Sequence, residues 1–329
     1  MMNVKQIDIR EQFQQLITEF SAELYPQHAI SNLQCHEPID EKFDKGFVLF
    51  SDDKIRATAC VIKNEKLAFK DKKAVCIAYY ECVEDVTFST KLLQTICDYC
   101  QKQGYSFMIG PLNGSTWKSY RFAVNPITDS YFSEPFHKAY YTEHFEKFGF
   151  EIAAEYVTQI DKTVVLPKNP NSDLNENISF RTLDKTNFET ELKNIYGFCK
   201  EIFHNNFLYT DIDEKTFLEK YLALKDVLNP EFVLLAEHNG EIVGLLLALH
   251  DYYCQTKKRI IVKTLGRKSG TLYTNVVAEL SHRIIEIALK HNYQSMLHAF
   301  MIESNTSKTL SSKQSGELFR RYKLYCKAL

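Results

Sequence analysis

The stretch "FVLLAEHNGEIVGLLLAL", Phe232 to Leu249, holds two apolar runs separated by the dipeptide Asn239-Gly240. Asn and Gly tolerate the positive φ angles of a two-residue turn, so this stretch predicts an antiparallel β-hairpin. The stretch "FVLFSDDKIRATACVI", Phe47 to Ile62, has the same form and turns at Asp52-Asp53. One hairpin is therefore expected in each half of the chain.

The segments around the two hairpins repeat as well. A short strand and an amphipathic helix precede each hairpin: "VKQIDI" and "REQFQQLITEFSAELY" in the first half, "SFRTL" and "NFETELKNIYGFCKEIF" in the second. After each hairpin come an apolar strand ("KAVCIAYY" or "RIIVKTL"), a long helix that ends in "QKQGY" or "LKHNY", and a further strand. Gly104 and Asn292 suit the left-handed cap of the two long helices.

Two copies of the order β-α-ββ-β-α-β predict an α/β protein with an α+β mixed sheet and two tandem domains. A chain of 329 residues has the length for two domains. The polar, Asn- and Pro-bearing stretch over 166–178 is the expected linker. We therefore predict an N-terminal domain over 1–165 and a C-terminal domain over 179–329.

Composition restricts the partners and the compartment. Forty basic and 42 acidic residues leave a net charge of -2, which favours neither nucleic acid nor an anionic membrane as a partner. The charged N-terminus does not resemble a signal peptide, and no apolar run is long enough to span a bilayer. We expect a cytoplasmic protein.

The nine cysteines lie mostly within apolar strand or helix patterns. Cys97 and Cys100 form a C-x-x-C pair, but it falls within a helix and has no second pair or His at zinc spacing. Buried, reduced thiols are the better interpretation, in agreement with the expected cytoplasmic location, and no metal site is predicted.

The order of the elements, with an Asn at the end of the last strand, resembles the GNAT superfamily of acyl-CoA N-acyltransferases, here in tandem. The resemblance covers nearly the whole chain. It rests on "RKSGTL", "SNTS" and "FRRYKLY" in the second half, and on "GPLN" and "EPFHKAYYTEHFEKFGF" in the first. The first-half motifs resemble a subset of bacterial GNAT-like proteins.

The resemblance implies a site for the pyrophosphate of acetyl-CoA or another acyl-CoA. The family builds it from Gln/Arg-x-x-Gly-x-Gly/Ala, which Arg267, Gly270 and Leu272 match except that Leu272 replaces the small final residue. Backbone N–H groups near a helix N-terminus favour an anion there. The implied cofactor-binding residues are Lys263, Thr264, Leu265, Gly266, Arg267, Lys268, Ser269, Gly270, Thr271, Leu272 and Asn305. The alternatives are a plain strand-to-helix connection at the turn and a plain helix cap at Asn305.

The equivalent stretch of the first half, "ECVEDVTF", lacks glycine. It places Glu81, Glu84 and Asp85 where a pyrophosphate would lie, so that like charges would meet. We expect this copy to be degenerate, to bind no CoA in the usual way, and to shape part of the substrate cleft.

The family commonly places an acid, a Tyr, four residues before the Gly of a final "GF" motif. Phe145 stands before Gly149 in the first half and Ser312 before Gly316 in the second, so neither copy keeps the Tyr. Either another residue serves, or the thiolate leaves unassisted, or the protein does not catalyse acyl transfer. The candidate catalytic residues are Tyr141, Glu237, Tyr273, His298 and Glu303.

The stretch "GPLNGSTWKSYRF", Gly110 to Phe122, ends the last strand of the first domain and opens a long insertion. Asn113, Trp117, Tyr120 and Arg121 are predicted to line the acceptor pocket, with a flat apolar wall and a cation suited to a carboxylate or phosphate. The alternative is that Trp117 anchors a loop and Arg121 meets a surface carboxylate.

The sequence therefore predicts an N-acyltransferase that moves an acyl group, foremost acetyl, from acyl-CoA to a small-molecule amine held between the two domains. The alternative is a non-catalytic protein of the same fold that binds CoA or a small metabolite. A charged tRNA as donor is disfavoured by the absence of a basic surplus. The acceptor, the acyl length and the oligomeric state are left open by the sequence.

Overall fold

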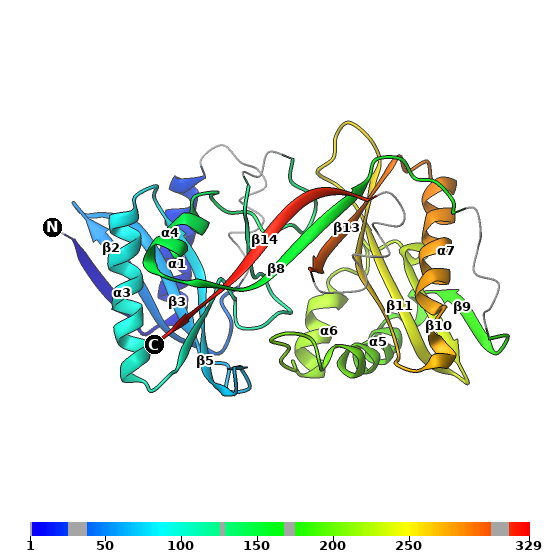
Figure 1. Ribbon diagram of the computed structural model, residues 1–329, viewed down its shortest axis with the longest axis horizontal. Helices are drawn as coiled ribbons and strands as arrows, with labels where there is room; N and C mark the ends of the chain where they lie inside the picture. Colours follow the sequence, from blue (N-terminus) through cyan, green and yellow to red (C-terminus); the bar gives the residue numbers. More distant parts are fainter. Residues whose placement is uncertain (1, 26–37, 126–128, 168–174, 304–315) are drawn as a thin grey trace.

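The computed structural model of the protein describes residues 2–25, 38–125, 129–167, 175–303 and 316–329. Asn305, Ser312 and most of the predicted linker lie outside these residues. Two halves lie side by side along the long axis of the molecule and are joined by two long strands that cross its middle (Figure 1).

The elements follow the predicted order in both halves. The first half contains β1 (Asn3–Ile7), α1 (Arg10–Leu24), β2 (Phe43–Ser51), β3 (Lys54–Ile62), β4 (Ala68–Phe69), β5 (Lys72–Cys82), α3 (Val86–Lys102), β6 (Phe107–Gly110), β7 (Phe122–Ala123), α4 (Tyr141–Phe148) and β8 (Glu151–Asp161). The second contains β9 (Ile178–Thr182), α5 (Phe188–Phe203), α6 (Glu214–Leu222), β10 (Val233–His238), β11 (Glu241–His250), β12 (Arg259–Arg267), α7 (Val276–Lys290), β13 (Ser295–Ile302) and β14 (Glu317–Ala328). Short 3-10 turns lie at Lys185–Asn187 (η1), Pro230–Phe232 (η2) and Thr271–Tyr273 (η3).

Both predicted hairpins form, as β2–β3 and β10–β11. Asp52 and Asp53 have φ angles of 52° and 57°, and Asn239 has a φ of 53°, so each turn uses the left-handed backbone that the sequence indicated. The long helices α3 and α7 are followed by Gly104 and Asn292 with φ angles of 76° and 58°. The mixed α/β fold in two tandem copies is confirmed.

One sheet runs through the whole molecule in the order β1-β2-β3-β5-β6-β14-β8-β13-β12-β11-β10-β9, with β4 beside β5 and β7 beside β14. The last strand of each half is exchanged: β14 pairs with β6 of the first half, and β8 pairs with β13 of the second. β8 and β14 also pair with each other, from Ile160↔Glu317 to Glu151↔Cys326 (Figure 1). The boundaries at 165 and 179 stay a prediction, and the sheet runs continuously from one half into the other.

Helices cover both faces of this sheet, because neighbouring residues of a strand point to opposite faces. In the second half, Leu234 and Ala236 of β10 pack with α7, while Val233 and Leu235 pack with α5. In the first half, α3 and α4 share one core cluster and α1 belongs to the other. Cys97 and Cys100 are buried on α3, and burial raises the pKa of both thiols.

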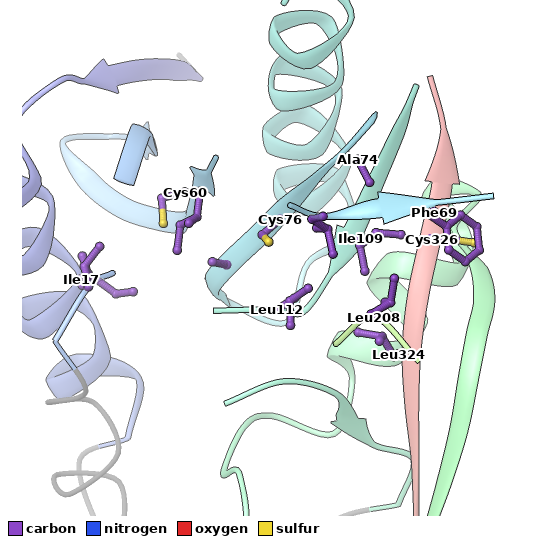
Figure 2. Packing of buried hydrophobic residues seen from close by; sticks show 14 of the residues in the cluster. Ile17, Cys60, Phe69, Ala74, Cys76, Ile109, Leu112, Leu208, Leu324 and Cys326 are labelled. Atoms are coloured by element: carbon purple, nitrogen blue, oxygen red, sulfur yellow. The ribbon is translucent and has the colours of Figure 1, made fainter. Parts of the chain in front are cut away.

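The halves share a hydrophobic core beyond the exchanged strands. Leu208, from the loop after α5, packs near Leu112 of the first half and Leu324 of β14 (Figure 2). Asn64 of the first half donates hydrogen bonds to Thr210 Oγ1 at 2.9 Å and to the Gly114 carbonyl at 2.8 Å. These contacts tie the α5–α6 loop to the first half. Among the described residues, no helix has the length and apolar content needed to cross a bilayer.

A buried polar network lies where the exchanged strands cross. Glu134 forms an ion pair with Arg320 of β14 at 2.6 Å, and both side chains are almost fully buried. Tyr322 donates a hydrogen bond to Glu134, and its hydroxyl also meets that of Tyr131 at 2.9 Å. Burial raises the pKa of Glu134, and the positive charge of Arg320 opposes this rise.

We expect Glu134→Ala to lower the free energy of unfolding by about 3–5 kcal/mol, because it leaves Arg320 buried without its carboxylate. Urea-induced unfolding measures this loss. The matched control is Lys162→Ala, which removes an ion pair with Glu317 whose side chains are 64% and 60% exposed and is expected to cost less than about 1 kcal/mol. Equal losses in both variants would contradict the role of the buried pair.

Candidate functional site

The strands β12 and β13 separate near the centre of the second half. They pair in parallel only over Arg259–Val262 and Ser295–His298, although β12 continues to Arg267 beside β11. The register with β11 shifts between Leu247 and Ala248, so that Lys263 has no direct opposite residue there. Such a bulge bends the strand. The separation leaves Lys263, Thr264 and Leu265 facing a gap in the sheet.

The turn after β12 is open on its outer side. Gly270 has a φ of 114°, which favours glycine, and a Cβ atom there would meet no other atom within 4 Å. Within the described residues, the backbone N–H groups of Ser269 and Gly270 donate no hydrogen bond. The turn therefore presents two N–H donors, and α7 begins only after η3, at Val276.

The cationic side chains of this turn, Arg267 and Lys268, make hydrogen bonds and ion pairs with neighbouring protein groups. Arg267 Nη1 donates to the carbonyls of Lys268 and Gly270 at 2.8 and 3.2 Å, so its positive charge lies over the turn. Lys268 Nζ forms ion pairs with Glu201 at 3.1 Å and Glu241 at 3.3 Å. Leu272, the departure from the family pattern, is 44% exposed and does not fill the turn.

Gly266 lies in a close contact between β12 and α5, whereas Thr271 is exposed after the turn. A Cβ at Gly266 would lie 2.4 Å from Ile202 Cδ1, so this glycine allows α5 to pack closely against β12. Thr271 opens η3 and is exposed. The predicted cofactor segment thus combines a splayed strand, an open turn and a close helix contact, while Asn305 lies outside the described residues.

The corresponding turn of the first half is closed by carboxylates. Asp85 caps α3 by accepting a hydrogen bond from the Thr87 N–H at 2.7 Å. Glu81 accepts hydrogen bonds from the hydroxyls of Tyr141 at 2.5 Å and Tyr25 at 2.8 Å. Burial raises the pKa of Glu81 to about 7, although the two hydroxyls act in the opposite direction. Glu81 lies near the end of β5 and Asp85 lies at the N-cap of α3, so that a carboxylate stands on each side of the turn that corresponds to the one at Gly270.

A cavity of about 1010 Å³ lies between the halves and reaches the gap beside β12. Its wall includes Phe188 of α5 and Ser281 of α7, which lie on opposite faces of the sheet, so the cavity extends through the separation of β12 and β13. Lys263, Thr264 and Leu265 line it. The aromatic and aliphatic residues on its α5–α6 side include Phe188, Leu192, Phe203, Phe217, Tyr221 and Leu228.

Three of the four predicted substrate residues line this cavity: Trp117, Tyr120 and Arg121. Trp117 packs edge-to-face on Phe217 of α6, with ring centroids 5.7 Å apart. Asn113 lies instead beside a smaller cavity of about 100 Å³ in the first half, where its Oδ1 accepts from the Tyr79 N–H at 3.1 Å. Contact with a substrate stays a prediction for all four residues.

Of the five candidate catalytic residues, His298 alone lines the large cavity among the described residues. Its Nε2 lies 2.8 Å from Asp161 Oδ2, and both side chains are largely buried. Asp161 ends β8, the strand that the first half contributes to the second. No sequence pattern links Asp161 to His298, because strand exchange creates this contact.

The other four candidates have structural partners elsewhere. Glu237 pairs with Arg181 at 2.6 Å, and Glu303 pairs with Arg321 at 3.0 Å. The Tyr273 hydroxyl lies 3.2 Å from His238 Nδ1, and Tyr141 is buried in the first half beside Glu81. Phe145, at the position of the family Tyr in the first half, is fully buried in a hydrophobic core.

Comparison with known proteins identifies the fold. No family model matches the sequence, and no curated protein matches it. A GCN5-related N-acetyltransferase from Sphaerobacter thermophilus superposes with a TM-score of 0.57 at 14% identity, covering 99% of this chain and 95% of its own. A tandem GNAT protein from the clavulanic acid biosynthesis pathway has a TM-score of 0.57 at 8% identity, with 100% and 98% covered. For Eis1 from Mycobacterium abscessus the TM-score is 0.54 at 10% identity, with 100% and 74% covered.

The chain therefore has the tandem GNAT fold over its whole length, as the order of its elements predicted. At these sequence identities, the structural similarity establishes the fold but not the substrates, which have to be inferred from the site.

We expect Glu81→Gln to change how stability depends on pH. Because the pKa of Glu81 is raised to about 7 from 4.5, the folded state binds this proton more tightly than the unfolded state does. The contribution to stability is present below about pH 4.5 and is lost as the pH rises through about 7. The free energy of unfolding of the wild type should therefore fall, relative to Glu81→Gln, between pH 5 and pH 8.

Urea unfolding at about five pH values measures this difference. Glu84→Gln is the control, since Glu84 is the exposed neighbour in the same turn. The same pH dependence in both variants would show that burial of Glu81 has no such effect.

Proposed function

We propose that the protein is an acyl-CoA-dependent N-acyltransferase that acylates a small-molecule amine held between its two halves. The observation that carries this proposal is the separation of β12 and β13, which opens directly into the large cavity. A donor and an acceptor could reach each other there from opposite faces of the sheet.

The residues of the second half fit the donor. The N–H groups of Ser269 and Gly270, with the Arg267 guanidinium beside them, would hold the pyrophosphate. The backbone of Lys263, Thr264 and Leu265 would follow the pantetheine arm along the gap. Acyl-CoA supplies a thioester carbonyl whose C–S bond breaks when the amine nitrogen attacks the carbonyl carbon to form an amide. The donor binds in the second half, because Glu81 and Asp85 close the turn of the first.

His298 is the base of this proposal. An Nε2–H directed at the Asp161 carboxylate leaves Nδ1 as the nitrogen that accepts a proton. The amine loses one proton when the amide forms, and Nδ1 would take it, while Asp161 stabilises the imidazolium. The leaving thiolate takes up one proton, from the His298 imidazolium or from water, so that the reaction neither gains nor loses a proton overall. Phe145 cannot supply this proton because it is an apolar residue of the first-half core.

We expect Ser269→Glu and Gly270→Glu to weaken acetyl-CoA binding at least tenfold, because each puts a negative charge beside the proposed pyrophosphate site. Isothermal titration calorimetry with CoA, acetyl-CoA and longer acyl-CoAs measures the dissociation constants. Ser269→Asn controls for loss of the serine side chain without added charge. Gly104→Glu controls for the replacement of a glycine at positive φ, since Gly104 has a φ of 76° and lies in the first half. No acyl-CoA binding by the wild type would remove the proposal.

We expect His298→Gln to lower kcat about 10²–10⁴-fold, and Asp161→Asn to lower it less, with acetyl-CoA binding unchanged in both. Release of the CoA thiol, measured with acetyl-CoA and a panel of amines, provides the rate. Glu237→Gln is the matched control, because Glu237 lies outside the cavity in an ion pair with Arg181. Unchanged kcat in His298→Gln would exclude His298 as the base. Tight acyl-CoA binding without turnover of any amine would favour the non-catalytic alternative.

A further inference from the structure

Among the residues that the structure describes, Arg121 is a buried cation without a negatively charged partner. Its side chain belongs to the buried polar residues, at 6% exposure, and within the described residues it forms no ion pair. Nε donates a long hydrogen bond of 3.3 Å to the Tyr120 carbonyl, and Nη1 is buried with no hydrogen-bond partner there. An unpaired buried charge is expensive, so this arrangement points to a missing anion.

Three aromatic rings surround the guanidinium group. Its central carbon lies 3.7 Å from the ring centroid of Tyr120, 4.3 Å from that of Tyr156 and 4.4 Å from that of Phe300. Each ring face attracts the positive charge of the guanidinium. The rings also fix the plane of the guanidinium, so that its N–H groups are preorganised to meet a planar acid group.

These rings come from different parts of the fold. Tyr120 belongs to the insertion of the first half, Tyr156 to the exchanged strand β8, and Phe300 to β13 beyond His298. Arg121 therefore lies at the junction of the two halves, and its guanidinium contacts Phe300 of β13, the strand that carries the proposed base. Arg121 lines both the large cavity and the smaller one.

The charged residues around the large cavity all have the same sign. Its described lining residues include Lys118, Arg121, Lys220 and Lys263, and none of them is Asp or Glu. Lys118 pairs with Asp40 at 3.0 Å, and Lys220 donates a hydrogen bond to the Trp117 carbonyl. A ligand that carries only positive charge would meet no compensating carboxylate in this wall.

The rest of the cavity favours an apolar body. Phe188, Phe217, Tyr221 and Leu228 lie on its α5–α6 side, and Trp117 faces this group from the first half. A cavity with an apolar wall and a guanidinium held in place by aromatic rings selects a molecule that has an apolar part and an acid group. A carboxylate, with a single negative charge and two oxygens, matches one guanidinium.

We propose that the large cavity binds a small molecule with an apolar, ring-sized body and a carboxylate, with the carboxylate held by Arg121 and the apolar body among the side chains of α5 and α6. If the protein is the transferase proposed above, the acceptor is an apolar amino acid or a similar amine that carries a carboxylate. This identification of the acceptor rests on the proposed function. The positive wall also disfavours the ammonium form of such an amine and thereby favours the neutral form that attacks the thioester.

Trp117 is the single tryptophan of the chain and lines the cavity, so its fluorescence reports binding at this place. The probes are 3-phenylpropionate, L-phenylalanine and phenethylamine, which share the ring and differ in the carboxylate and the amine. We expect the two carboxylates to bind at least tenfold more tightly than phenethylamine. Binding of phenethylamine as tight as that of the carboxylates, or no response to any probe at millimolar concentration, would overturn the proposal.

Arg121→Met, which keeps the length and removes the charge, should abolish the preference for the carboxylates, and Arg121→Lys should retain part of it. The matched control is Arg283→Met, which removes an arginine that lies 4.6 Å over the Phe180 ring and outside the cavity. A preference that persists in a folded Arg121→Met variant would also overturn the proposal, and the probe series on the wild type decides it if that variant does not fold. Carboxylate-dependent binding without acyl transfer would leave this inference intact and remove the transferase alone.

Discussion

The antiparallel pairing of β8 with β14 is the contact on which the rest of the molecule depends. Each strand is the last of its half, and each completes the sheet of the other half: β8 beside β13 and β14 beside β6. The two halves therefore share one set of backbone hydrogen bonds, and the sheet fixes their relative position. The pairing of β8 with β14 therefore also sets the positions of the residues from both halves that line the cavity.

The exchange also assembles the groups that matter for the proposed chemistry. β8 brings Asp161 to His298 and Tyr156 to Arg121, so one strand of the first half orients the base and forms part of the cage around the cation. The first half, whose own turn carries carboxylates, thus contributes residues to the proposed site of the second half. The strand exchange lets residues of the first half complete the proposed site of the second half.

Charge is compensated at most buried positions of this protein. Arg259 is bound by Asp251 at 2.5 Å and Asp129 at 3.0 Å, and Arg320 is paired with Glu134. Arg121 differs from both, because its neighbours within the described residues are rings and a carbonyl. Among the described residues the other buried guanidinium groups are paired with carboxylates, and this contrast is the physical basis of the proposed carboxylate specificity.

The sequence by itself determined the local elements and their order. The apolar runs of the hairpins, the helical period in α3 and α7, and the turn residues are all properties of neighbouring residues, and each appears where it was predicted. His298 and Arg121 were recognised as candidates because a strand His and a loop Arg beside aromatics are visible in any sequence. Only the tertiary structure decided which strands pair, since the sequences of two apolar strands of similar length do not specify their pairing partners. For this reason the Asp161–His298 contact, the placement of Asn113 away from Trp117, and the acid-free wall around Arg121 could be found only in the fold, where residues far apart in the chain meet.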